Sequence, residues 1–213
     1  MIGRLSGFRG TFINEKFFDI KKDKQNRIIN AGLKVFAEHG YRHASTDEIV
    51  KEADISKGLL FHYFGSKIGT YTFLHEYSVR YMILEYNSYV SGKETDPFVI
   101  IAQIEQAKLE AMKSHPYMIT FLESCEREVV SEPLLATEES KNMLREVTYN
   151  LTENMNFSMI RKDCDVPKLL EIISYTIDGL RKKSFSEGSF QADMLYADIV
   201  TYLEMIRLLS CNY

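Results

Sequence analysis

The sequence has few of the residues that interrupt helices. Among 213 residues there are only 4 prolines and 11 glycines, and this scarcity favours long helices over a turn-rich β fold. No run of about 18 apolar residues occurs, so we expect no transmembrane helix and no membrane partner. Residues 1–10 lack the apolar core of a signal peptide, and we therefore expect a cytoplasmic protein.

Cysteine is also sparse. Cys125, Cys164 and Cys211 are far apart in the sequence, and no Cys-x-x-Cys pair occurs. This pattern argues against a disulfide framework or a zinc ribbon and suits a reducing compartment. A redox-sensing thiol is the alternative, but no neighbouring feature of the sequence indicates a reactive thiolate.

The sequence has no recognisable catalytic or metal-binding motif. It contains neither a Gly-x-x-x-x-Gly-Lys phosphate loop nor a Gly-x-Ser-x-Gly elbow. His39 and His43 are four residues apart, but Gly40 between them is expected to end a helix, so they need not share a face. A group of carboxylates is interpreted as a solvated helix face: Glu123, Glu126 and Glu128. We expect no enzyme, no metal and no cofactor.

Positive charge is concentrated in the first third of the chain. Residues 1–70 carry 12 Lys and Arg against 8 Asp and Glu, whereas residues 71–213 carry 14 against 22. A basic segment joined to an acidic remainder suits a nucleic-acid reader attached to a part that does not touch DNA. The Gly-rich residues 1–11 contain two arginines, and a basic arm that reaches the minor groove is one interpretation of them.

The most informative stretch begins at Ser45. Ser45 followed three residues later by Glu48 is a capping-box pattern that can open a helix. A tight turn is expected at Asp54, and Ser56 can cap a second short helix. Two short helices with so brief a connection predict a helix-turn-helix whose second helix enters the DNA major groove.

The spacing of residues 57–64 predicts which side of this second helix is buried. At about 100° per residue, Leu60 and Phe64 fall together on the side that packs on neighbouring helices. The other side and its flanks carry the residues expected to meet DNA: Gly58, Leu59 and His62, flanked by Lys57, Phe61 and Tyr63. The alternative is that this segment is merely a buried apolar helix or strand.

Helices are expected on both sides of this motif. A helix from about Asp23 to His39 should end at Gly40, and another capped by Ser66 should run to about Val90. Lys67 in the first turn opposes the helix dipole, which makes sense if a phosphate binds there. Further helices are expected over 97–115, 117–130, 137–156, 167–185 and 190–210, with a loop at 131–135. The prediction is an all-α protein of about nine helices.

Several motifs together resemble the DNA-binding domain of the TetR family of transcriptional regulators. They are Gly-Tyr, Ser-Thr-x-x-Ile-x-x-x-Ala, Ile-Ser-Lys-Gly-x-Leu and His-Tyr-Phe-x-x-Lys, and the match runs from about Lys22 to Met82. The residues in register are Phe36, Gly40, Tyr41, Ala53, Lys57, Gly58, His62, Tyr63, Phe64 and Lys67. Leu59 and Phe61 depart from the family, which often has a small residue and usually Tyr at these positions.

The resemblance implies a domain organisation and a mode of DNA binding. Residues 1–21 would be an N-terminal extension, 22–82 the DNA-binding domain with its motif at 45–64, and 83–213 an effector-binding and dimerisation domain. Residues 57–64 would read bases, and phosphates would be held by Ser45, Thr46, Tyr63 and Lys67. The last two helices are richly apolar, and with the same pair of a second subunit they would form a homodimer that reads a pseudo-palindromic operator in double-stranded DNA.

The resemblance also implies a small-molecule effector. Met and aromatic side chains of the middle helices could line its cavity: Met112, Tyr117, Phe121, Tyr149, Met155, Met159 and Tyr175. The alternative for each is an ordinary core position. The expected function is a repressor released from DNA by an apolar or amphipathic effector. The competing hypothesis is a helical protein that binds a small molecule or lipid and no longer reads DNA.

Overall fold

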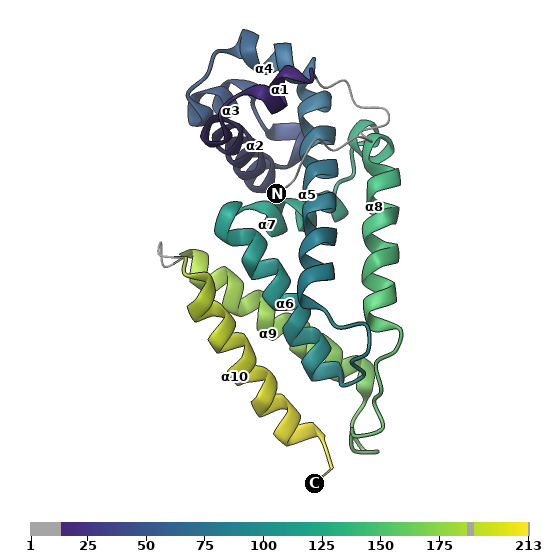
Figure 1. The fold of residues 1–213 in the computed structure, drawn as a ribbon. Coiled ribbons are helices and arrows are strands. Elements are labelled where there is room, and N and C mark those ends of the chain that lie inside the picture. Colours follow the sequence, from purple (N-terminus) through teal and green to yellow (C-terminus); the bar gives the residue numbers. More distant parts are fainter. Residues whose placement is uncertain (1–13, 187–189, 213) are drawn as a thin grey trace. The chain divides into compact units, whose positions relative to one another are not determined.

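The computed structural model describes residues 14–186 and 190–212. These residues form ten helices and no strand, which confirms the all-α prediction with one helix more than expected (Figure 1). The helices are α1 (Lys16–Asp19), α2 (Lys22–His43), α3 (Thr46–Ala53), α4 (Lys57–Phe64), α5 (Lys67–Tyr89), α6 (Pro97–Ser114), α7 (Met118–Glu126), α8 (Ser131–Thr152), α9 (Val166–Ser186) and α10 (Ala192–Ser210). No helix in the described ranges combines the length and hydrophobicity needed to span a bilayer.

The chain packs into two compact units. The first unit contains the described residues up to 83 together with 114–145, and the second contains 84–113 together with those from 146 onward. By packing, α7 and the first turns of α8 therefore belong with the predicted DNA-binding helices. The functional boundary at residue 82 stays a prediction, because packing does not say which residues bind DNA or effector.

Aromatic side chains form the core of the first unit. Phe17 of α1 is fully buried, and its ring centroid lies 5.0 Å from that of Phe64 and 5.3 Å from that of Phe73. Tyr71 lies 5.0 Å from Phe36 and 5.4 Å from Phe121, edge to face in both pairs. Such pairs contribute about 0.5–1.5 kcal/mol each beyond burial. They fix α1, α2, α4, α5 and α7 to one another.

The turn between α2 and α3 depends on a glycine and two distant carboxylates. Gly40 has φ 65° and ψ 175°, and this backbone conformation interrupts α2 near the predicted end. A residue with a side chain would disfavour it. Directly after it, the Tyr41 backbone N–H donates to Glu128 at 3.1 Å, and the Tyr41 hydroxyl donates to Glu132 at 2.6 Å. The interpretation of Glu128 as part of a solvated face is therefore wrong, since it is half-buried and holds this turn.

The loop predicted at 131–135 is the first turn of α8. The chain is helical from Ser131, and Leu134 N–H donates to the Val130 carbonyl. Pro133 is the third helical residue, where a missing N–H costs nothing because the first N–H groups of a helix have no intrahelical partner. Proline here marks the start of a helix rather than a loop.

The second unit is built around α9 and α10, which pack on each other. Buried residues recur every four positions on both helices, at Leu169, Ile173 and Ile177 and at Leu195, Ile199 and Leu203. The end of α10 is fixed by two backbone hydrogen bonds, Arg161 N–H to Ser210 O and Asn212 N–H to Met159 O. Arg207 forms an ion pair of 2.6 Å with Asp96 at the start of α6.

Candidate DNA-binding surface

The helix-turn-helix has the two serine caps and the turn that the sequence predicts, but the Glu48 carboxylate bonds to His39 instead of completing a capping box with Ser45. Ser45 Oγ accepts a hydrogen bond from the Asp47 N–H at 3.2 Å, and Ser56 Oγ accepts from the Leu59 N–H at 3.2 Å. Asp54 joins the helices in the left-handed conformation, with φ 52° and ψ 55°. The Glu48 carboxylate lies 3.2 Å from His39 Nε2, so Glu48 connects α3 to α2. Two eight-residue helices result, each with a capped N-terminus.

The predicted orientation of α4 is confirmed for most of its residues. Leu60 and Phe64 are 0% and 1% exposed and pack into the first unit. On the other side Lys57, Gly58 and His62 are exposed, and Leu59 and Phe61 are half-buried. Ser45 is exposed and Thr46 half-buried at the start of α3. The second short helix therefore presents a mixed polar and apolar face, as a groove-reading helix requires.

Tyr63 does not lie on the flank of that face as predicted. It is 5% exposed, and its ring lies 5.4 Å from that of Phe17. The angular argument placed Tyr63 at the boundary, and α1, which covers this boundary, decides the outcome. A phosphate contact of Tyr63 stays a prediction.

The two lysines among the predicted DNA-binding residues differ in their surroundings. Lys57 is exposed, and its Nζ lies 2.8 Å from Asp47 Oδ1. Lys67 is half-buried, with Nζ 4.8 Å from the centre of the Tyr41 ring and 3.4 Å from the Arg42 carbonyl. Burial lowers the pKa of Lys67, against the opposing effect of Glu132 and Glu128. Lys67 thus has a structural role beside the predicted phosphate contact.

Residues predicted to line an effector cavity are distributed over both units. In the first unit Phe121 is part of the aromatic core, and Tyr117 is half-buried at the start of α7. Those of the second unit have different environments: Met112 is 0% exposed, Met155 and Met159 are half-buried, and Tyr149 and Tyr175 are 65% and 70% exposed. Because their exposure differs so widely, it does not identify these residues as the lining of one cavity. Effector binding by them stays a prediction.

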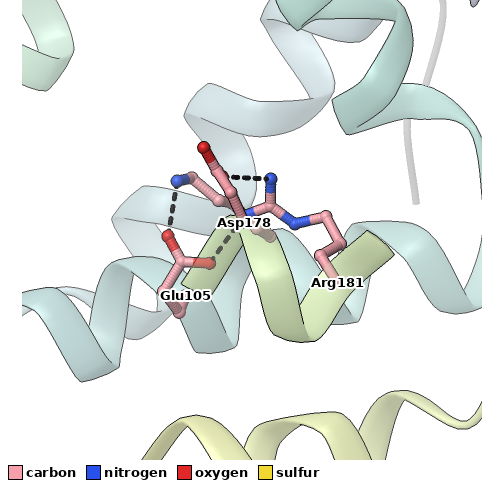
Figure 2. Close-up of polar contacts among 4 residues, drawn as sticks. Glu105, Asp178 and Arg181 are labelled. Carbon is pink, nitrogen blue, oxygen red and sulfur yellow. Dashed lines mark hydrogen bonds and ion pairs between the residues drawn. The ribbon is translucent and has the colours of Figure 1, made fainter. Parts of the chain in front are cut away.

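A buried charged cluster in the second unit was not predicted. Figure 2 shows that Arg181 of α9 pairs with Glu105 of α6 and with Asp178 of its own helix. Arg181 lies 3.1 Å from Glu105 and 3.4 Å from Asp178, and Lys108 lies 2.5 Å from Glu105. The side chains of Glu105 and Arg181 are only 5% and 6% exposed. No group of three or more metal-ligating side chains occurs in the described part of the chain.

Comparison with known proteins agrees with this geometry. The model of the family described as bacterial regulatory proteins, tetR family, matches residues 28–69. The uncharacterized HTH-type transcriptional regulator YuxN of Bacillus subtilis (strain 168) is 50% identical over 46 residues, which are 22% of this chain and 16% of that protein. The present chain thus matches only a small part of the length of this relative.

Two solved structures share the fold over nearly the whole chain. A TetR family transcriptional regulator from Chloroflexus aurantiacus J-10-fl is 15% identical, with a TM-score of 0.59 over 95% of this chain and 100% of that one. The ketosteroid transcriptional regulator KstR2 of Mycobacterium tuberculosis is 17% identical, with a TM-score of 0.63 over 91% and 97%. At such identities the likeness concerns the fold alone.

The caps, the left-handed turn and the exposed face of α4 define a helix-turn-helix protein. The segment that matches the tetR family of bacterial regulatory proteins, residues 28–69, contains most of α2 and all of α3 and α4. The curated relatives that match over 46 residues are described as HTH-type transcriptional regulators.

Proposed function

We propose that this protein is a sequence-specific DNA-binding transcriptional regulator. The observation that carries the proposal is the face of α4, where Lys57, Gly58 and His62 are exposed while Leu60 and Phe64 anchor the opposite side. A helix held so firmly on one side can enter the major groove without losing packing. We propose residues 22–82 as the DNA-binding domain and 83–213 as the effector-binding and dimerisation domain.

The chemistry of this face suggests how DNA would be read. A Cβ added at Gly58 would meet no atom within 4 Å, so the surface there is open to close approach by a base edge. Leu59 and Phe61 suit thymine methyl groups and sugars, and His62 can hydrogen-bond. The exposed N-terminus of α3, with Ser45 and Thr46, suits a phosphate because its backbone N–H groups and dipole favour anions.

A salt titration of DNA binding tests this proposal with two variants. Lys67→Ala is expected to weaken binding to all sequences and to lower the salt slope by about one, because a phosphate contact is sequence-independent. Leu59→Ala is expected to change the preference among operator sequences instead. Binding is measured by fluorescence anisotropy on operator candidates from the neighbouring genomic DNA.

Two controls accompany this measurement. Urea unfolding of Lys67→Ala separates loss of its packing on Tyr41 from loss of a phosphate contact, and Lys162→Ala removes an exposed lysine outside the proposed face. An unchanged salt slope for Lys67→Ala would contradict its assignment to a phosphate. Failure of the unaltered protein to prefer any operator would favour the alternative, a helical small-molecule or lipid binding protein that no longer reads DNA.

We also propose that the protein is a homodimer through α9 and α10. Large apolar side chains of these helices are 44–72% exposed: Ile172, Tyr175, Met194, Tyr202, Met205, Leu208 and Leu209. So many exposed apolar groups on two neighbouring helices are typical of an interface. A twofold dimer would place two α4 helices about 34 Å apart on a pseudo-palindromic operator.

Charge introduced on α10 is expected to separate the subunits. Met205→Glu should raise the dimer dissociation constant at least about tenfold, because a carboxylate loses its hydration in an apolar interface. Leu135→Glu is the matched control, since Leu135 is 73% exposed but lies on α8. Sedimentation equilibrium measures both. Equal behaviour of the two variants would argue against α10 as the interface.

The proposed regulator is a repressor that an apolar or amphipathic effector releases from DNA. Support comes from the buried Met112 and the half-buried Met155 and Met159 of the second unit, because thioether side chains adapt to apolar ligands. An effector must bind the DNA-free state better than the DNA-bound state, so the effector and the operator weaken each other's binding equally.

A further inference from the structure

Asn14 lies directly beside the exposed end of α4. Its side-chain Nδ2 is 3.0 Å from Nε2 of His62, 48 residues away in the sequence. Its backbone N–H donates to the carbonyl oxygen of Tyr63 at 2.9 Å. The sequence motif does not include Asn14, and no local pattern relates it to α4.

The hydrogen bonds of Asn14 determine the orientation of its amide. The Lys16 backbone N–H donates to Asn14 Oδ1 at 3.1 Å. A backbone N–H can only donate, so the oxygen of the amide must face Lys16 and the NH₂ group must face His62. Flipping the amide would place two donors against each other at Lys16.

This orientation also determines where His62 carries its proton. Because Asn14 Nδ2 donates, Nε2 of His62 must accept, and the proton of the neutral ring lies on Nδ1. In water a histidine side chain prefers the Nε2–H form, so the contact with Asn14 selects the less common tautomer. His62 is exposed and can therefore offer Nδ1–H as a donor to a molecule that covers α4.

We infer that Asn14 is a positioning residue that makes His62 a hydrogen-bond donor toward DNA through Nδ1. The inference rests on the proposed function, because it assigns the chemistry of one contact at the proposed DNA-binding face. The group recognised would be an acceptor, either a phosphate oxygen or an acceptor on a base edge such as guanine N7.

The position of Asn14 does not depend on its own side chain. Its backbone is bonded to Tyr63, and three residues later Phe17 is fully buried among Tyr63, Phe64 and Phe73. Asn14→Ala should therefore leave the segment in place and remove only the bond to His62. This makes the variant suitable for a functional test.

The tautomer can be measured in the protein without DNA. Long-range ¹H–¹⁵N NMR correlations of the histidine ring distinguish Nδ1–H from Nε2–H at mildly alkaline pH, where an ordinary imidazole is neutral. We expect the Nδ1–H form in the unaltered protein and the Nε2–H form in Asn14→Ala. In Asn14→Asp the carboxylate would accept from His62, so Nε2–H should again be present. Nε2–H in the unaltered protein, or no change in Asn14→Ala, would overturn the inference.

A double-mutant cycle then connects the tautomer to DNA binding. Asn14→Ala is expected to reduce operator affinity about fivefold, the effect of one neutral hydrogen bond. In the His62→Ala background the same change should have less than about a twofold effect, because its partner is missing. Lys16→Ala is the control: it keeps the backbone N–H and should have the same effect in both backgrounds.

The outcomes separate this inference from the proposed function. Equal losses from Asn14→Ala in both backgrounds would mean that Asn14 does not act through His62, and would overturn it. A loss shared by all DNA sequences assigns the acceptor to a phosphate, and a loss confined to the operator assigns it to a base; both support it. If the unaltered protein binds no DNA, the function fails and His62 has no DNA partner, whereas the NMR result still reports the tautomer.

Discussion

Replacing Gly69 by alanine is expected to lower the free energy of unfolding of the first unit by about 3 kcal/mol. Gly69 is the third residue of α5, and its N–H donates to Ser66 Oγ at 3.1 Å. A Cβ at this position would overlap the carbonyl oxygen of Phe64, the last residue of α4. Since that obstacle is backbone and not a flexible side chain, α4 and α5 would have to separate. Urea unfolding followed by circular dichroism measures the loss.

Gly58→Ala is the matched control for this prediction. Gly58 is also a glycine in a helix, but an added Cβ would have no neighbour within 4 Å. Alanine should therefore stabilise the fold by about 0.5–1 kcal/mol through its higher helix propensity. If α4 enters the groove at this residue, the same variant should bind the operator less well. Wild-type stability for Gly69→Ala would mean that the α4–α5 junction relaxes easily, contrary to the prediction.

The helix-turn-helix could be predicted from the sequence because its signals are local. Ser45 and Ser56 cap helices within three residues, Asp54 suits a left-handed turn, and the helical period separates Leu60 from His62. Each signal acts between residues that are close in the chain. The same local rules failed for Tyr63, which α1 covers, because they do not specify which other element approaches.

The long-range polar contacts could not be predicted in this way. Glu128 and Glu132 meet Tyr41 across 87 and 91 residues, and Asn14 meets His62 across 48. In a sequence, a glutamate that holds a distant backbone N–H looks the same as one in water. The predicted effector residues illustrate the same problem, since a phenylalanine of a cavity wall and Phe121 in the aromatic core have the same local pattern.

The charged cluster of the second unit leads to the other large expected effect. Arg181→Met is expected to lower the free energy of unfolding of that unit by about 3 kcal/mol, because it leaves Glu105 with a single cation in a buried site. This loss should be near the lower end of the range for breaking a buried ion pair, since Lys108 remains 2.5 Å from Glu105. Arg145→Met is the control. Its pair with Glu126 is 61% and 46% exposed, so the loss should be at most about 1 kcal/mol.

The double variant Glu105→Met/Arg181→Met is expected to recover most of this stability. It removes both buried charges together, while Lys108 and Asp178, with side chains 25% and 45% exposed, can reach water. Burial raises the pKa of Glu105, but Lys108 and Arg181 together outweigh it, so the pKa lies below its ordinary value. The ionised carboxylate therefore stabilises the fold above the ordinary carboxyl pKa, and this contribution is lost as the pH falls through the lowered pKa. Urea titrations at neutral and acidic pH should therefore show that acidification lowers the free energy of unfolding less in the double variant than in the unaltered protein. If the double variant is as unstable as Arg181→Met, side-chain packing and not charge pairing holds α6 to α9.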